Sequence, residues 1–377
     1  MTIPMTDLVD QYRALKPEID EALHRVLTNG SFILGEEVKS FEEAVADYAS
    51  VSQAVGVASG TDALVLALLA CGIGDGDEVI TTPFSFIATS EAIARTGATP
   101  VFIDIEPDTL NMDCQALAAA LTPRTKGIVP VHLYGQPCDM TTLMSLAKAH
   151  DLRVIEDCAQ AQGATWKRQQ VGSFGDCGCF SFFPSKMLGA YGDGGLVTTN
   201  SADVADRLRT LRNHGATTTY HHDFRGFNSR LDALQAAILK VKLQHLPEWI
   251  ERRRAIAARY SEAFDTMPGV ETLCERQDAC HVFNYYTIRI DGAAARRDSL
   301  ASHLKNCDVA SAVYYPRPLH VQQVYAGLGY KLDDLPHAAL ASQQLLSLPI
   351  YPEMSSDQVQ QVIDTVTSFK GFKYIGE

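Results

Sequence analysis

Short β-branched runs alternate with helical stretches through the first 200 residues, and this alternation constrains the fold more than any other feature of the sequence. Turn signals rich in Gly, Asp and Pro separate the elements. The pattern predicts strands at 54–58, 78–81, 100–103, 127–131 and 153–156, and helices at 61–70, 87–96 and 140–150. We therefore expect an α/β fold whose mostly parallel sheet is covered by helices on both faces.

The second half of the 377-residue chain has a different pattern. Residues 231–264 are long-helical and rich in charge, and Pro247 within them indicates two helices or one kinked helix. A strand at 285–290 and a helix at 296–306 follow. We expect a large domain over residues 1–250, with an N-terminal segment able to pack on the small domain, and a small C-terminal α/β domain over residues 251–377.

Composition limits the partners and the compartment. The chain has 32 Lys and Arg against 45 Asp and Glu, a net charge of −13, which argues against nucleic acids and anionic membranes as partners. It contains no apolar run of about 18 residues, and its first 20 residues do not resemble a secretory signal. Nine scattered cysteines indicate reduced thiols rather than a metal or disulfide framework. A cytoplasmic protein without a metal site is expected.

The segment ASGTDA at 58–63 ends a predicted strand and begins a helix. Amides at a helix N-terminus favour an anion, Gly60 permits close backbone approach, and Thr61 adds a hydroxyl. An ordinary helix cap explains the same residues. The chain lacks the phosphate-binding motif G-x-x-x-x-G-K-[ST], and G-x-G-x-x-G does not follow the early strands, so NTP hydrolysis and dinucleotide binding lose their usual support.

Two further residues complete a possible site. Asp157 lies at the carboxyl end of a predicted strand, where open α/β sheets bind ligands, although it could also cap a helix. Lys186 follows the apolar and aromatic run 179–183. Desolvation there would lower the pKa of its amine and suit it to imine formation, whereas a surface lysine on a turn is the alternative. A pyridoxal phosphate site needs this combination of a phosphate cradle, a carboxylate and a lysine.

The sequence resembles the DegT/StrS-type nucleotide-sugar aminotransferases over essentially its whole length. The matching blocks are SGTDAL (59–64), TPFSFIAT (82–89), PVHLYGQPCDM (130–140), VIEDCAQAQGA (154–164), GCFSFFPSKMLGAYGDGG (178–195), RNHG (212–215), GFNSRLDALQAAIL (226–239) and YYPRPLH (314–320). These enzymes are fold type I pyridoxal phosphate transferases, and the resemblance is greatest to members that aminate C3. It implies a seven-stranded, mostly parallel sheet in the large domain.

The resemblance also implies roles for individual residues. Lys186 forms the imine with the cofactor and then carries the proton between substrate and cofactor, while Asp157 pairs with the pyridinium nitrogen. The other implied cofactor contacts are Gln160 near the ring hydroxyl, Gly60, Thr61 and Ser181 on the phosphate, Phe86 stacked on the ring, and Asn228 reaching the phosphate from the second subunit of a homodimer. A core aromatic at Phe86 and a turn residue at Asn228 are the plainer interpretations.

Substrate contacts are implied for Tyr191, Arg230, Tyr315 and His320. A surface ion pair for Arg230 and a structural role for His320 remain alternatives. The tandem His221-His222-Asp223 is interpreted as an exposed loop, because consecutive residues do not easily share one ion.

The implied reaction transfers the amine of L-glutamate to the cofactor, giving 2-oxoglutarate and pyridoxamine phosphate, and then to a keto group of a dTDP- or UDP-linked sugar. Amination at C3, in the synthesis of amino sugars for surface polysaccharides, is expected, and C4 amination is the alternative. Three other functions are less favoured. A dehydratase of this fold would have His in place of Lys186, a non-catalytic regulator would not need the intact site, and a nicotinamide-dependent enzyme would need a glycine fingerprint.

Overall fold

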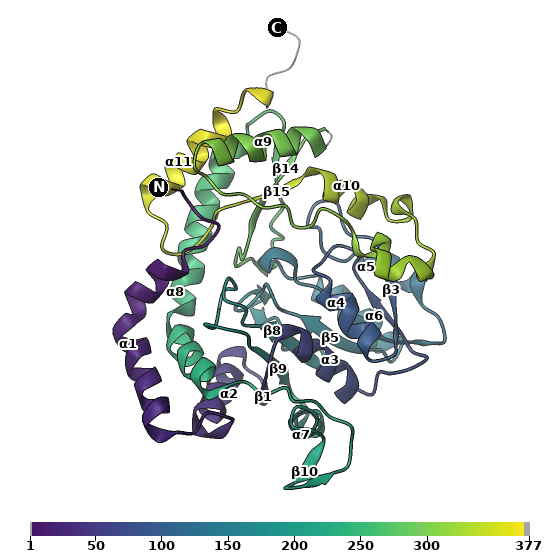
Figure 1. The fold of residues 1–377 in the computed structure, drawn as a ribbon. Helices are drawn as coiled ribbons and strands as arrows, with labels where there is room; N and C mark the ends of the chain where they lie inside the picture. Colours follow the sequence, from purple (N-terminus) through teal and green to yellow (C-terminus); the bar gives the residue numbers. More distant parts are fainter. Residues whose placement is uncertain (1, 293, 373–377) are drawn as a thin grey trace.

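A seven-stranded sheet forms the centre of the large part of the molecule in the computed structural model, which describes residues 2–292 and 294–372 (Figure 1). Its strand order is β1-β9-β8-β5-β4-β2-β3, and only β9 runs antiparallel to its neighbours. The strands are β1 Gln53–Val57, β2 Glu78–Thr81, β3 Thr99–Phe102, β4 Thr125–Val129, β5 Arg153–Asp157, β8 Cys177–Ser181 and β9 Gly195–Thr199. The predicted mostly parallel α/β sheet is confirmed, with strand ends shifted by one or two residues.

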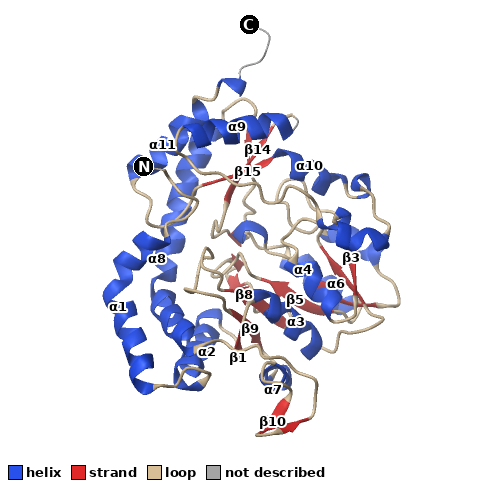
Figure 2. Ribbon diagram, viewed as in Figure 1, coloured by secondary structure: helices blue, strands red, loops and turns tan. Residues whose placement is uncertain are grey.

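Helices cover both faces of this sheet (Figure 2). One face packs against α3 Gly60–Ala70, α4 Ala88–Arg95 and α7 Ala202–Leu211. The other face packs against α2 Gly35–Ala49, α6 Met140–Ala149 and the first half of α8 Ala233–Phe264. Because the sheet is covered on both sides, successive residues of β2, β5 and β9 are buried rather than alternately buried and exposed.

The long helix α8 connects the large sheet to the C-terminal part of the chain (Figure 1). It continues through Pro247 as one element, because side chains on both sides of the proline, including Leu246 and Ile250, are buried and hold the helix in place. The proposed domain boundary at residue 250 falls inside this helix and stays a prediction.

A small three-stranded sheet, β12 Val270–Thr272, β14 Tyr286–Ile290 and β15 Leu345–Leu348, follows α8. It packs with α9 Ala294–Asn306 and α11 Ser356–Thr367 in a second apolar core. The N-terminal segment joins this core, since Ile3 pairs with Val309 and is buried there. The remaining long helices are α1 Leu8–Asn29, beside α8, and α10 Pro336–Gln344. None of the helices described is long and apolar enough to cross a membrane.

Two glycines let the start of α3 lie directly against the ends of β8 and β9. A Cβ on Gly60 would lie 2.5 Å from the Cβ of Ser181, and a Cβ on Gly195 would lie 2.2 Å from the carbonyl oxygen of Ser59. Side chains at these positions would force the helix away from the sheet. The close approach therefore sets the position of the α3 N-terminus relative to the carboxyl ends of β5 and β8.

Candidate active site

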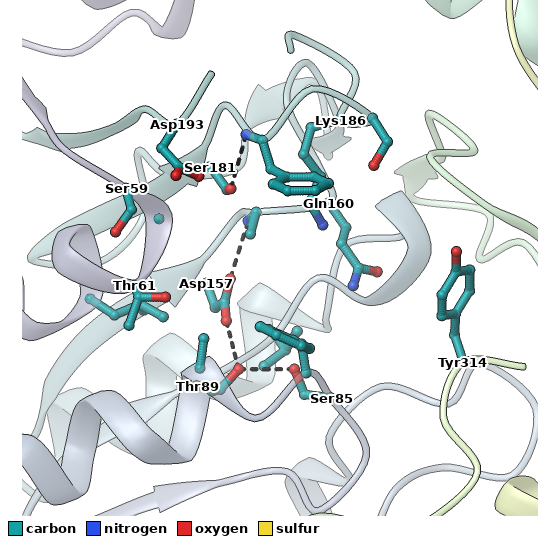
Figure 3. Close-up of a pocket in the computed structure, with 18 of the residues that line it drawn as sticks. Ser59, Thr61, Ser85, Thr89, Asp157, Gln160, Ser181, Lys186, Asp193 and Tyr314 are labelled. Carbon is teal, nitrogen blue, oxygen red and sulfur yellow. Dashed lines mark hydrogen bonds between the residues drawn. The ribbon is translucent and has the colours of Figure 1, made fainter. Parts of the chain in front are cut away.

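A cavity of about 590 Å³ opens at the carboxyl edge of the large sheet (Figure 3). Its walls come from the first turn of α3, the segment that leads into α4, the ends of β5 and β8, and the loop between β8 and β9. Tyr285, Tyr314 and Tyr315 reach it from the C-terminal part of the chain. Of the predicted site residues, the cavity is lined by Gly60, Thr61, Phe86, Asp157, Gln160, Ser181, Lys186 and Tyr315.

Lys186 lies on the loop that follows β8 and faces this cavity. Its backbone N–H donates to the carbonyl of Phe183 at 2.9 Å, which fixes a turn at the base of the side chain. Desolvation lowers the pKa of the Lys186 amine to about 8, and the Asp157 carboxylate partly opposes this shift. A substantial fraction of the amine is therefore neutral and nucleophilic near physiological pH.

Asp157 ends β5 with a carboxylate that is almost completely buried. Its Oδ2 accepts a hydrogen bond from Thr89 Oγ1 at 2.7 Å, and its Oδ1 accepts one from the Ala159 N–H at 3.1 Å (Figure 3). Desolvation raises the pKa of the carboxyl, whereas these two hydrogen bonds and the Lys186 charge lower it. No Lys, Arg or His side chain among residues 2–292 and 294–372 forms an ion pair with it. The site thus presents a carboxylate able to receive a cationic group from a ligand.

Gln160 is held on both sides of its amide. Its Oε1 accepts from the Tyr134 N–H at 2.7 Å, and its Nε2 donates to the hydroxyl of Tyr315 at 3.0 Å. Phe86 is 57% exposed, and its ring lies 6.4 Å from that of Tyr315. The ring is therefore not a core aromatic, and it is free to cover a planar ligand.

The first turn of α3 supplies the anion-binding part of the site. Ser59 caps the helix by accepting from the Asp62 N–H, while Gly60 and Thr61 line the cavity. The hydroxyl of Ser181, at the end of β8, lies against Gly60. Helix amides and two hydroxyls on one wall match the oxygens of a phosphate.

Four predicted contacts lie outside this cavity. Asn228 and Arg230 line a neighbouring hollow of about 410 Å³, which shares Asp193 with the first. Arg230 donates to the amide oxygen of Asn213 at 2.8 Å and forms no ion pair with any residue the structure describes. These two residues therefore do not meet Lys186 within one chain.

Tyr191 and His320 do not line this cavity, and their contacts with the sugar stay predictions. Tyr191 packs edge-on against Tyr12, with the Lys242 ammonium 4.1 Å from its ring centroid. His320 is buried and turns its Nε2 toward the carbonyl oxygen of Leu332 at 3.4 Å, beside a separate hollow. The predicted loop around His221 and His222 is instead an exposed hairpin, β10 Ala216–Thr218 and β11 His221–His222.

Several wall residues have no counterpart in the sequence-based prediction. Thr89, Ser85, Tyr285, Tyr314 and Asp193 all face the cavity. Thr89 and Ser85 belong to the TPFSFIAT block. A hydroxyl side chain close to the start of a predicted helix is the sequence signal that could have identified them. The tyrosines come from segments more than 90 residues beyond Lys186, and local patterns do not place them.

The buried side chains of Glu156 and His132 behind the site resemble part of a metal site, but their polar atoms already form hydrogen bonds within the protein. Glu156 accepts hydrogen bonds from the N–H groups of Gly172, Phe174 and Gly175, and from His132 Nε2 at 3.1 Å. The other ring nitrogen of His132 accepts from the Cys138 N–H. These contacts hold β5 and its neighbouring turns in place beside Asp157.

The fold and the site together define an α/β protein with a lysine and a buried carboxylate facing one cavity. The family model described as "DegT/DnrJ/EryC1/StrS aminotransferase family" matches residues 13–367, and the chain belongs to this family. The predicted family is confirmed.

Relatives and solved structures match the chain over nearly its full length. A Geobacillus stearothermophilus "Pleiotropic regulatory protein" is 48% identical, with 98% of this chain and 99% of the relative covered. An Acidithiobacillus ferrooxidans "UDP-N-acetyl-3-dehydro-alpha-D-glucosamine 3-aminotranferase" is 46% identical, with 97% of each chain covered. The crystal structure of S. venezuelae DesV "in complex with ketimine intermediate" has a TM-score of 0.94 at 42% identity and covers 97% of this chain and 98% of its own.

The lowered pKa of Lys186 predicts how its amine reacts with pH. Imine formation with an added aromatic aldehyde, trapped by borohydride and located by mass spectrometry, should rise with a midpoint near pH 8, because the amine must lose its proton to attack. Asp157→Asn removes the charge that raises this pKa, so its midpoint should lie at lower pH. Lys186→Arg is the control for labelling elsewhere. A midpoint near pH 10.5, the ordinary pKa of lysine, would contradict the lowered pKa that we assign to Lys186.

Proposed function

We propose that this protein is a pyridoxal phosphate-dependent aminotransferase that moves the amino group of L-glutamate to the C3 keto group of a dTDP- or UDP-linked sugar. The observation that carries the proposal is the cavity in which Lys186, Asp157 and the α3 N-terminus face one another. The net reaction exchanges an amine for a ketone, so glutamate leaves as 2-oxoglutarate and the keto sugar leaves as an amino sugar.

The residues present fit the cofactor. The α3 amides, Thr61 and Ser181 would hold its phosphate, and Asp157, which has no cationic partner in the described chain, would accept its protonated ring nitrogen. Gln160 would lie beside the ring hydroxyl, and Phe86 would cover the ring. When bound, the cofactor would supply an electron sink for the substrate carbon and a carrier for the amine.

Lys186 and Asp157 have distinct tasks in this scheme. Lys186 Nζ would hold the cofactor and, once freed by the donor amine, would take the proton from the α-carbon of glutamate. In the second half it gives a proton to the sugar carbon that receives nitrogen. Asp157 stays ionised and holds the ring nitrogen protonated throughout. Tyr285, Tyr314 and Tyr315 close the wall opposite α3 and limit the entry of water.

The substrate class rests on relatives. A 46% identical relative is named for 3-amination of a UDP-linked sugar, and such products serve amino-sugar and polysaccharide synthesis. Amination at C4 remains the alternative position. A cytoplasmic location suits free thiols at all nine cysteines, since disulfides are rare in that reducing compartment.

We also propose a homodimer with shared sites. Asn228 and Arg230 line a hollow next to the cavity yet do not enter it, so a second copy is needed to bring them to the phosphate and the substrate. The exposed Ile33 lines the same hollow, and the chain exposes further large apolar side chains at Phe32, Tyr220, Phe224 and Phe227. A partner subunit would cover them.

A regulator without catalytic activity is the second candidate, because one 48% identical relative is named a regulatory protein. The intact set of Lys186, Asp157 and Gln160 favours the enzyme. The two functions differ in their response to an amine donor.

The absorbance of the purified protein separates enzyme from regulator. With bound cofactor the wild type should show a visible band that L-glutamate removes and a suitable keto sugar restores. Lys186→Ala should bind the cofactor but turn over roughly 100- to 10,000-fold more slowly, because the proton carrier is gone. A wild-type band unaffected by glutamate would contradict the enzyme and favour the regulator.

Complementation tests the shared site. Lys186→Ala and Asn228→Ala subunits, each weakly active alone, should regain activity when co-expressed, because one site of the mixed dimer then has both Lys186 and the partner's Asn228. A mixture of Lys186→Ala with Lys186→Arg is the control and should stay inactive. No gain in hybrid dimers verified by mass spectrometry would mean that Asn228 acts within its own chain or not at all.

A further inference from the structure

Thr89 is the one side chain described here that donates a hydrogen bond to the Asp157 carboxylate. The Thr89 Oγ1 to Asp157 Oδ2 distance is 2.7 Å, and the residues are 1% and 5% exposed. The second donor is the backbone N–H of Ala159, which binds the other oxygen at 3.1 Å. Figure 3 shows the dashed lines that join Asp157 to Thr89 and Thr89 to Ser85. Orientation of this carboxylate therefore depends on one hydroxyl and one amide.

Asp157 and Ser85 together fix the direction in which the Thr89 hydroxyl donates. An ionised carboxylate only accepts hydrogen bonds, so the single hydroxyl proton of Thr89 must point toward Asp157. The Thr89 oxygen then accepts from Ser85 Oγ at 2.9 Å, and Ser85 is 3% exposed. Donation thus runs from Ser85 to Thr89 to Asp157.

The hydroxyl of Ser90, next to Thr89 on α4, does not make the same kind of contact. Ser90 donates to the carbonyl oxygen of Ile87 in its own segment, as helical Ser and Thr hydroxyls commonly do. Thr89 instead donates to a residue 68 positions along the chain. Both hydroxyls are buried, but only that of Thr89 contacts the site.

We propose that Thr89, supported by Ser85, is a positioning residue that aims the Asp157 carboxylate at the cofactor ring nitrogen and keeps it an acceptor. This inference rests on the proposed function, since it assumes that the ring nitrogen lies at Asp157. Without the Thr89 hydroxyl, Oδ2 would have no protein donor and the carboxylate could rotate or take up a proton. Thr89 acts through Asp157 and is not itself expected to contact the substrate.

Cofactor affinity of the apoprotein provides a readout independent of turnover. Thr89→Val keeps the shape and removes the donor, so pyridoxal phosphate should bind roughly 10- to 100-fold more weakly, the loss expected for a hydrogen bond to a charged group. The absorbance of the bound cofactor should also shift, because its ring nitrogen is less fully protonated. Ser85→Ala should weaken binding by roughly two- to tenfold. Thr89→Ser should restore both affinity and spectrum.

Ser90→Ala is the matched control, a buried hydroxyl lost from the same helix turn, and it should leave affinity and spectrum unchanged. A double-variant cycle tests the route of action: adding Thr89→Val to Asp157→Asn should not weaken binding further. If circular dichroism of the apoprotein shows that Thr89→Val does not fold, the cofactor affinities and spectra of Ser85→Ala and Thr89→Ser test the proposal instead.

Three results would overturn the proposal: unchanged affinity and spectrum in Thr89→Val, equal damage in Ser90→Ala, or additive losses in the double variant. If the wild type failed to bind pyridoxal phosphate, the proposed function and this inference would both be wrong. If it bound the cofactor and reacted with glutamate while Thr89→Val matched it, only this inference would be wrong.

Discussion

The buried Asp157 carboxylate is the group on which the rest of the site depends. A charge at this depth is costly unless hydrogen bonds and an opposite charge compensate it. Thr89 and Ala159 supply the hydrogen bonds, but no cationic side chain in the described chain pairs with it at close range. The chain therefore tolerates an unfavourable charge where a cationic ligand can neutralise it, which explains why the cavity opens directly above the residue.

The strand order brings the remaining groups to this carboxylate. β5 lies next to β8 in the sheet, so the ends of the two strands place Asp157 beside the loop that carries Lys186. The antiparallel β9 returns past the α3 N-terminus, where Gly195 lets the backbone of Ser59 approach closely. The carboxylate is thus held by a strand and the anion-binding amides by a helix end, while the amine lies on the loop that joins two neighbouring strands, β8 and β9.

Local sequence patterns predicted the sheet, and the three residues that they singled out line one cavity in the structure. Strand ends and helix starts carry distinct local signals, and Gly60, Asp157 and Lys186 stand next to them. Pro247 predicted two helices or one kinked helix. The structure has one helix, because tertiary packing keeps α8 continuous where local rules favour a break. Tyr191 and His320 were drawn from family motifs, yet their side chains turn toward Lys242 and the Leu332 carbonyl.

The contacts that sequence did not predict are those made between distant segments. The hydrogen bond from Thr89 to Asp157 joins two strand–helix units, and Tyr285 and Tyr314 reach the cavity from segments that follow α8. Residue spacing carries no information on such pairs. Residue spacing is equally uninformative about the contacts of Asn228 and Arg230, since the groups that we propose they contact belong to another copy of the chain.

Transfer of labelled nitrogen tests the central claim most directly. The protein would be incubated with nitrogen-15 L-glutamate and each of a set of 3-keto and 4-keto nucleotide sugars, and the products examined by NMR. The account predicts that the label appears on C3 of a dTDP- or UDP-linked sugar, with one 2-oxoglutarate formed per amino sugar and far less of both formed by Lys186→Ala. Label at C4 would correct the position, and label in no sugar, from protein with bound cofactor, would contradict the function.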